Sequence, residues 1–132
     1  MKIYIGGSFN SRARIKNEAN YLIDSGHVVL SRWFNEDDAI EKIWDQNFGG
    51  RAAEAMAMGD SYDIMEADCV IIDSIEKSSS GGSDTELGMA LMRALVGRPL
   101  RIIHIGPYRN IFQNLAREHY GSWAEMLEDS GL

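Results

Sequence analysis

Four short apolar runs, each leading into a polar or glycine-containing loop, constrain the fold of this chain most strongly. Between the runs the apolar residues recur with helical spacing. Alternating strand and helix signals of this kind are typical of a parallel sheet with helices on both faces. We therefore predict an α/β three-layer sandwich. The four runs are "KIYI" (2–5), "VVLSRWF" (28–34), "DCVIID" (68–73) and "LRIIHI" (100–105).

The helical patterns predict where the connections fold. We expect helices from about residue 11 to a glycine C-cap at Gly26, from 51 to about 67, and from 83 to about 96. A short helix from residue 110, a fifth strand near 117–120 and a last helix in the tail complete the prediction. In the 83–96 helix we expect the inward residues to be Leu87, Ala90, Leu91, Ala94 and Leu95.

The length of 132 residues predicts a single domain spanning 1–132. The formal net charge of −7 argues against a surface for DNA or RNA, because phosphate backbones require clustered lysine and arginine. A single nucleotide stays possible, since one phosphate can bind backbone N–H groups at a helix N-terminus.

Cellular location follows from two features. The lone Cys69 lies in a strand-like run and has no internal disulfide partner, so we expect a buried thiol in an intracellular, cytoplasmic protein. The N-terminus begins directly with a strand pattern, and we predict neither a signal peptide nor a membrane span.

The loops after the strands predict the position of a binding site. In open parallel sheets a ligand lies beyond the carboxyl ends of the strands. The loop Gly6–Asn10 begins with two glycines, which let the backbone approach a ligand closely, although this stretch taken alone is better explained by a tight turn. It matches neither the G-x-G-x-x-G fingerprint nor a Walker P-loop.

Glu86 lies where the loop "SSSGGS" enters a helix. Ser83 and Glu86 match the capping box S-x-x-E, in which the serine caps the helix and the glutamate bonds back to it. The same position suits a nucleophile, because a helix N-terminus favours an ionised carboxylate. Asp60 precedes the strand that feeds this loop, so we expect it close to Glu86.

Four segments in this order resemble the nucleoside 2-deoxyribosyltransferase superfamily, including its branch of 2'-deoxynucleoside 5'-phosphate N-hydrolases. The resemblance covers residues 1 to about 115, and E-L-G after a glycine-rich loop is its most specific motif. It implies a flavodoxin-like or Rossmann-like parallel sheet of four to five strands and a homo-oligomer. The segments are "MKIYIGGSFNSR", "MGDSYDIMEADCVII", "SGGSDTELGMAL" and "GRPLRIIHIGPYRNIFQNL".

The resemblance also implies roles. Glu86 would be the nucleophile on C1' of deoxyribose, and Asp60 would help to protonate the departing base, as in a retaining glycosidase. No metal or other cofactor is required, and the three histidines are too scattered in sequence to predict a ligand set. The residues expected at the substrate are Tyr4, Gly6, Gly7, Ser8, Phe9, Asn10, Trp33, Ser80 and Gly82.

Ser80 separates the two branches. Transferases of the superfamily tend to have aspartate six residues before the nucleophile, whereas the monophosphate hydrolases have a serine that contacts the 5'-phosphate. Ser8 matches another such serine, and Arg12 is the nearest candidate for a phosphate-binding arginine.

Three functions therefore remain open. The first is a transferase that passes deoxyribose from one nucleobase to another. The second is a hydrolase of 2'-deoxynucleoside 5'-monophosphates, and the third is a non-catalytic nucleotide-binding protein. All three imply small-molecule ligands rather than nucleic acid polymers or membranes.

Aromatic residues are expected to sandwich the base, although core packing explains aromatic residues equally well. Trp33, Trp44 and Phe48 are the candidates, with Phe9 and Tyr62 behind them. Residues 35–50 are predicted to form a mobile helix and loop that contacts the base.

Overall fold

The structure is a computed structural model that describes residues 1–35, 43, 46–78 and 80–132. Within these residues a single sheet of five parallel strands has the order β2-β1-β3-β4-β5. This order and the α/β layers confirm the predicted flavodoxin-like fold. The strands are β1 (Lys2–Gly6), β2 (Val28–Val29), β3 (Cys69–Asp73), β4 (Arg101–Ile105) and β5 (Glu118–Tyr120).

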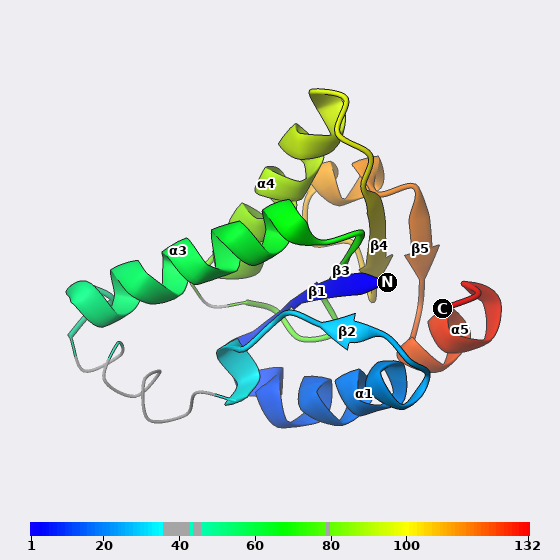
Figure 1. The fold of residues 1–132 in the computed structure, drawn as a ribbon, viewed down its shortest axis with the longest axis horizontal. Coiled ribbons are helices and arrows are strands. Elements are labelled where there is room, and N and C mark those ends of the chain that lie inside the picture. The colour runs from blue at the N-terminus through cyan, green and yellow to red at the C-terminus, as the bar shows by residue number, and fades with distance from the viewer. Residues whose placement is uncertain (36–42, 44–45, 79) are drawn as a thin grey trace.

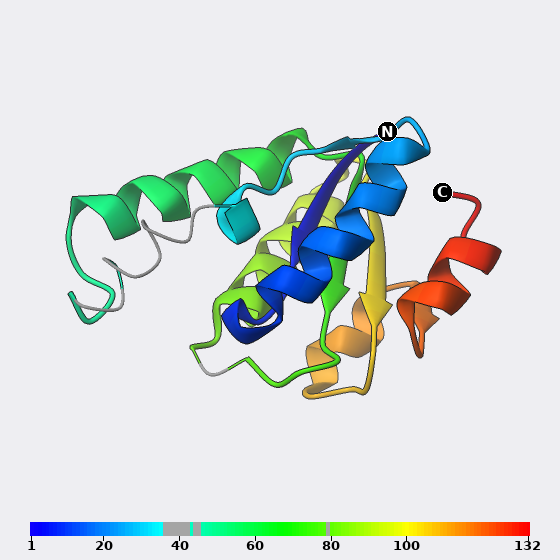
Figure 2. The same cartoon turned by 90° about the horizontal axis from the view of Figure 1, so that it is seen from below.

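Helices cover both faces of the sheet. Figure 1 shows α3 and α4 on one face and α1 and α5 on the other, and Figure 2 shows α1 lying along the sheet. Short 3-10 helices, η1 (Phe9–Ser11), η2 (Trp33–Asn35) and η3 (Ile111–Leu115), lie in the connections. The α-helices are α1 (Arg12–Asp24), α3 (Arg51–Glu66), α4 (Gly82–Leu95) and α5 (Trp123–Asp129).

Two apolar cores lie on opposite faces of the sheet because side chains alternate along each strand. In β1, Ile3 and Ile5 pack under α1 and α5, whereas Tyr4 between them packs on the face covered by α3 and α4. Cys69 is buried in the first core, and burial raises the pKa of its thiol to about 12. Tyr4 therefore starts from a central strand and points toward the helices that carry Asp60 and Glu86.

The second strand is shorter than predicted. We expected a strand over 28–34, but β2 ends at Val29. Beyond it, side chains replace the strand backbone: the Ile5 N–H donates to Ser31 Oγ at 2.6 Å, and Trp33 Nε1 donates to the Ile5 carbonyl at 2.8 Å. Because these side chains form hydrogen bonds with the N–H and the carbonyl of Ile5, β1 needs no further strand backbone there, and the chain turns into η2.

Two expectations for the outer surface of α4 are wrong. Ala94 and Leu95 are exposed, Leu95 by 77%, although we predicted both to face inward. The other three predicted inward residues of this helix are buried. No helix among the described residues has the length and apolar character needed to cross a membrane.

The sheet order places a crevice at one end of the molecule. The chain leaves β1 toward β2 on one side and leaves β3 toward β4 on the other. The loops after β1 and β3 therefore diverge, and ligands of such sheets bind at this point. These loops contain the Gly6-Gly7 turn and the approach to Glu86.

Candidate active site

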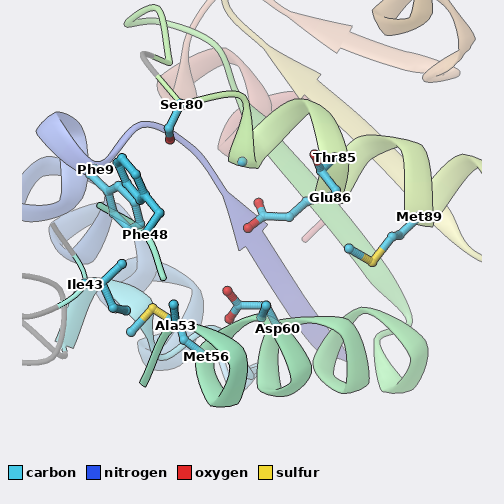
Figure 3. Close-up of a pocket in the computed structure, with 12 residues that line it drawn as sticks. Phe9, Ile43, Phe48, Ala53, Met56, Asp60, Ser80, Thr85, Glu86 and Met89 are labelled. Carbon is cyan, nitrogen blue, oxygen red and sulfur yellow. The ribbon is translucent and has the colours of Figure 1, made fainter. Parts of the chain in front are cut away.

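A cavity of about 610 Å³ lies between α3 and α4. Both expected carboxylates line it, and Figure 3 shows Asp60 on α3 and Glu86 on α4 facing each other across it. The remaining lining residues come from η1, both helices, the loop before α4 and two described residues of the 35–50 segment: Phe9, Ile43, Phe48, Ala53, Met56, Ala57, Ser80, Gly82, Thr85 and Met89.

Glu86 is held by one neighbour on β1. The Tyr4 hydroxyl donates to Glu86 Oε1 at 2.9 Å, and Tyr4 is fully buried. Oε2 of Glu86 is buried and has no hydrogen-bond partner among the described residues. A buried carboxyl oxygen without a partner is costly, and packing alone does not explain its place in the site.

The surroundings of Glu86 favour its protonated form. Burial, with a smaller contribution from the charge of Asp60, raises the Glu86 pKa to about 8, and the hydrogen bond from Tyr4 works in the opposite direction. Burial and the same two carboxylates raise the pKa of Tyr4 well above its ordinary value. Tyr4 is therefore a hydrogen-bond donor to Glu86 rather than a base.

The capping box predicted at the start of α4 is wrong. The helix begins one residue earlier than expected, and its N-cap is Gly81 in a left-handed conformation, φ 75°. Ser83 lies within the first turn, and the Glu86 side chain bonds to Tyr4 rather than to the backbone before it. Helix capping therefore does not explain Glu86. Its side chain instead makes a long-range contact with Tyr4 on β1.

Gly6 is required by the position of Glu86. A Cβ atom on Gly6 would overlap Glu86 Oε2 and lie 3.1 Å from the Ile72 side chain. At Gly7 a Cβ would lie 2.5 Å from Ile15 Cδ1. Both glycines are thus explained by the close approach of other side chains, Glu86 and Ile15, whereas close approach to a ligand stays a prediction.

The other predicted substrate residues divide into two groups. Phe9, Ser80 and Gly82 line the cavity. Ser8 is buried and caps η1 by accepting from the Asn10 N–H, while Asn10 lines a separate surface hollow. The structure therefore does not bring Ser8 and Asn10 into the lining of the main cavity.

A narrow polar recess extends the cavity. It shares Asp60, Ser80 and Glu86 with the main cavity, and its further lining includes Ser78 and Ser83. Trp33 and Gly7 lie in the wall of this recess. Its hydroxyl groups gather beside the first turn of α4, where the helix N-terminus attracts anions.

Two of the aromatic residues predicted to sandwich the base, Phe48 and Phe9, line the cavity. Phe9 and Trp33 pack edge to face, with ring centroids 5.8 Å apart. Tyr62 is 64% exposed and outside the described lining. Trp44 lies outside the described residues, as does most of the predicted helix and loop over 35–50.

Sequence reasoning missed two methionines in the cavity wall. Met56 lies one turn before Asp60 on α3, and Met89 lies one turn after Glu86 on α4. Residues three or four apart share a helix face. The spacing alone could have identified both methionines, because each lies three or four residues from a carboxylate that was expected in the site.

The prediction also overlooked Asp73 at the end of β3. This buried carboxylate accepts two hydrogen bonds from Arg14, at 2.8 and 3.0 Å, and one from Trp123 Nε1 at 2.6 Å. It also accepts from the Ile75 N–H at 3.0 Å. Asp73 thus joins α1 and α5 to the start of the loop that leads to Glu86.

Two of the histidines are adjacent, contrary to their separation in sequence. His104 and His119 lie opposite each other on β4 and β5, with Nδ1 atoms 2.9 Å apart. Burial, and then the charge of His119, lowers the His104 pKa to about 4. Among the described residues, no cluster of three or more histidine, cysteine, aspartate or glutamate side chains is arranged to hold a metal ion.

Comparison with solved structures gives a full-length likeness. A CMP N-glycosidase of Clostridium botulinum, BcmB, superposes with a TM-score of 0.58, and the superposition covers 100% of both chains. The two chains share one fold. Their sequences are 15% identical, so the likeness to the N-glycosidase concerns the fold and agrees with the resemblance seen in the sequence motifs. No family model matches the sequence, and no curated protein matches it.

Proposed function

We propose that this protein cleaves the N-glycosidic bond of 2'-deoxynucleotides, with Glu86 as the nucleophile and Asp60 as the acid. The observation that carries the proposal is the pair of carboxylates facing each other from α3 and α4 across one cavity (Figure 3). Retaining glycosidases place two carboxyl groups around the anomeric carbon in this way.

In the first step a carboxylate oxygen of Glu86 forms a bond to C1' of the sugar. The bond between C1' and the base nitrogen breaks, and the base leaves with the electron pair. Asp60 supplies the proton that the departing base takes up. The product is a deoxyribosyl ester of Glu86 and a free base.

In the second step a water molecule attacks C1' and the ester bond to Glu86 breaks. Asp60, now ionised, accepts the proton of the water, which restores both carboxyl groups. If a second nucleobase attacks instead of water, the same intermediate completes a transfer. The two outcomes therefore share every residue of the first step.

The electrostatics of the pair couple the protonation of Glu86 to that of Asp60. The charge of Asp60 is one cause of the raised Glu86 pKa. A proton on Asp60 removes that repulsion, so the two groups favour a state with one shared proton. The reaction uses the state in which Asp60 holds it and Glu86 is ionised.

Two observations favour a 5'-monophosphate substrate and water as the acceptor. Ser78, Ser80 and Ser83 gather at the N-terminus of α4 in the polar recess beside Glu86. Hydroxyl groups and a helix N-terminus together bind phosphate well. In addition, a solved structure with the same fold is that of a CMP N-glycosidase.

Product analysis by liquid chromatography tests the proposal. The protein is incubated with deoxynucleosides and with deoxynucleoside 5'-monophosphates, with and without a second free base. We expect free base and deoxyribose 5-phosphate from the monophosphates. Base exchange would instead support transfer, and no consumption of any substrate would support a nucleotide-binding protein.

We further propose that the protein forms a homo-oligomer. Large apolar side chains are exposed on α3 and α4, including Met58, Tyr62 and Leu95, and such surface is typical of subunit contacts. Light scattering coupled to size-exclusion chromatography tests this. A monomer mass at micromolar concentration would contradict it.

A further inference from the structure

The cavity wall is chemically divided. Polar groups lie at one end, where Glu86, Ser80 and Thr85 belong to α4 or the loop before it. Away from this end the described wall is apolar, and Figure 3 shows Ile43, Ala53 and Met56 together beside Asp60. The apolar residues of this part are Ile43, Phe48, Ala53, Met56 and Ala57, whereas Phe9 lies near Ser80 and Met89 lies beyond Glu86 on α4 (Figure 3).

The polar recess orients the proposed substrate. If the 5'-phosphate lies against Ser78 and Ser83, the sugar is next to Glu86 and C1' lies between the two carboxylates. The departing base receives its proton from Asp60. The base is therefore adjacent to the wall that α3 contributes beside Asp60.

That wall is built by helical spacing. Ala53, Met56 and Ala57 lie seven, four and three residues before Asp60 and share its face of α3. Across the cavity, Met89 follows Glu86 by one turn of α4. Each carboxylate thus has a methionine one turn away, and a base in reach of Asp60 lies close to methyl and thioether groups.

Resting on the proposed function, we propose that this site selects nucleotides whose base carries an apolar substituent. The polar edges of an unsubstituted base gain little from alanine and methionine side chains. An alkyl group on the ring gains about fourfold in binding for each methylene removed from water. Methionine side chains adapt to such groups because they are unbranched and flexible.

Two substrate series test the selection. The first is 2'-deoxyuridine 5'-monophosphate with hydrogen, methyl, ethyl or hydroxymethyl at ring position 5. The second is 2'-deoxyadenosine 5'-monophosphate with hydrogen, methyl or ethyl on the exocyclic nitrogen. Ethyl and hydroxymethyl have the same number of non-hydrogen atoms, so their comparison separates polarity from size.

In at least one series we expect kcat/KM for the ethyl compound to exceed that for the unsubstituted one by about tenfold. In the pyrimidine series we expect hydroxymethyl to fall well below ethyl if that series shows the preference. Equal or better turnover of the unsubstituted compounds in both series would overturn the selection and leave the proposed function intact. No turnover of any compound would instead reject the proposed function, and the selection with it.

Matched variants locate the effect. Met56→Gln and Met89→Gln place an amide in the wall, and each should reduce the ethyl preference at least threefold. The controls are Met65→Gln on α3 and Met92→Gln on α4, whose side chains are 37% and 59% exposed and outside the described lining. A preference that survives both wall variants, or that the controls remove equally, would contradict the assignment.

Discussion

The absence of a Cβ atom at Gly6 leaves room for the carboxyl group of Glu86, the proposed nucleophile. The space that a Cβ would occupy is filled by Glu86 Oε2, and the backbone of Gly6 is not in the left-handed region. An alanine is therefore compatible with the strand but not with the present position of the carboxylate. The constraint at this residue comes from the site rather than from the fold.

Gly6→Ala is expected to lower kcat/KM by more than about 100-fold, since a displacement of about 1 Å is enough to misplace a catalytic group. The melting temperature should change little, because the end of a glutamate side chain can move. Gly88→Ala is the control: no atom lies near its added Cβ, so activity should persist. A fully active Gly6→Ala variant would contradict the position proposed for Glu86.

Tyr4→Phe tests the hydrogen bond to Glu86. That bond lowers the Glu86 pKa, so its loss should raise the pKa further and shift the shared proton from Asp60 toward Glu86. Because the reaction uses the pair with one proton, we expect wild-type activity to fall as the pH rises through about 8, where that proton is lost. In the variant, activity at pH 7 should fall about tenfold, and the difference from the wild type should shrink at alkaline pH because the falling limb moves to higher pH.

Profiles from pH 5.5 to 9.5 check this shift. Tyr21→Phe, at an exposed position of α1, is the control. An equal loss of activity at every pH would show that Tyr4 acts by packing alone.

At the scale of elements, the connections after β1 and β3 are fixed by side chains rather than by strand pairing. Ser31 and Trp33 complete the edge of β1 where β2 has ended. Asp73 gathers donors from α1, α5 and its own loop at the end of β3. These contacts hold the two loops that flank the cavity.

Asp73→Asn should cost about 3 kcal/mol of unfolding free energy, because an amide cannot accept both Arg14 hydrogen bonds and leaves the guanidinium poorly paired. Thermal unfolding should show a fall of about 10 °C. Asp24→Asn, at an exposed residue of the same α1, should change the melting temperature by no more than a degree or two. A fall no larger than that of the control would mean that Asp73 does not join the elements.

The element boundaries show what local patterns reveal and what they miss. Apolar runs and glycine stops predicted α3 and α4 to within a residue or two, and Asn110 caps η3, the short helix predicted from residue 110. The S-x-x-E pattern and the long second strand were misleading. In both cases a long-range contact replaced the local one: Tyr4 binds Glu86, and Ser31 binds Ile5.

At the scale of the whole molecule, strand order was not contained in the local patterns, although the alternation of strand and helix determined the class of fold. The resemblance to the nucleoside 2-deoxyribosyltransferase superfamily led to Glu86 and Asp60, which the topology then brings to one cavity. The two methionines of the cavity lining, Met56 and Met89, and the contacts of Asp73 were not predicted. They depend on which helix faces meet, and that follows from packing.

The raised Glu86 pKa links the site to the stability of the whole chain. Because the pKa in the folded protein is higher than the ordinary value of 4.5, protonated Glu86 stabilises the fold at low pH. This contribution is fully present below about pH 4.5 and is lost as the pH rises through about 8. Glutamine at this position stays neutral and loses nothing over the same range.

Glu86→Gln should therefore melt close to the wild type at pH 4.5 and about 5 °C or more above it at pH 8.5. Scanning calorimetry of both proteins across this range measures the difference, in which the other titrating groups cancel. Parallel melting curves at every pH would show that the fold does not depend on ionisation of Glu86.

The central claim is that Glu86 forms a covalent bond to the sugar. Rapid acid quenching of a turnover mixture, followed by intact-mass and peptide mass spectrometry, tests it most directly. We expect the mass of the protein to rise by one deoxyribosyl phosphate unit, located on the peptide that contains Glu86, and neither adduct nor turnover in a well-folded Glu86→Gln variant. An adduct on another residue, or turnover by that variant at the wild-type rate, would contradict the claim.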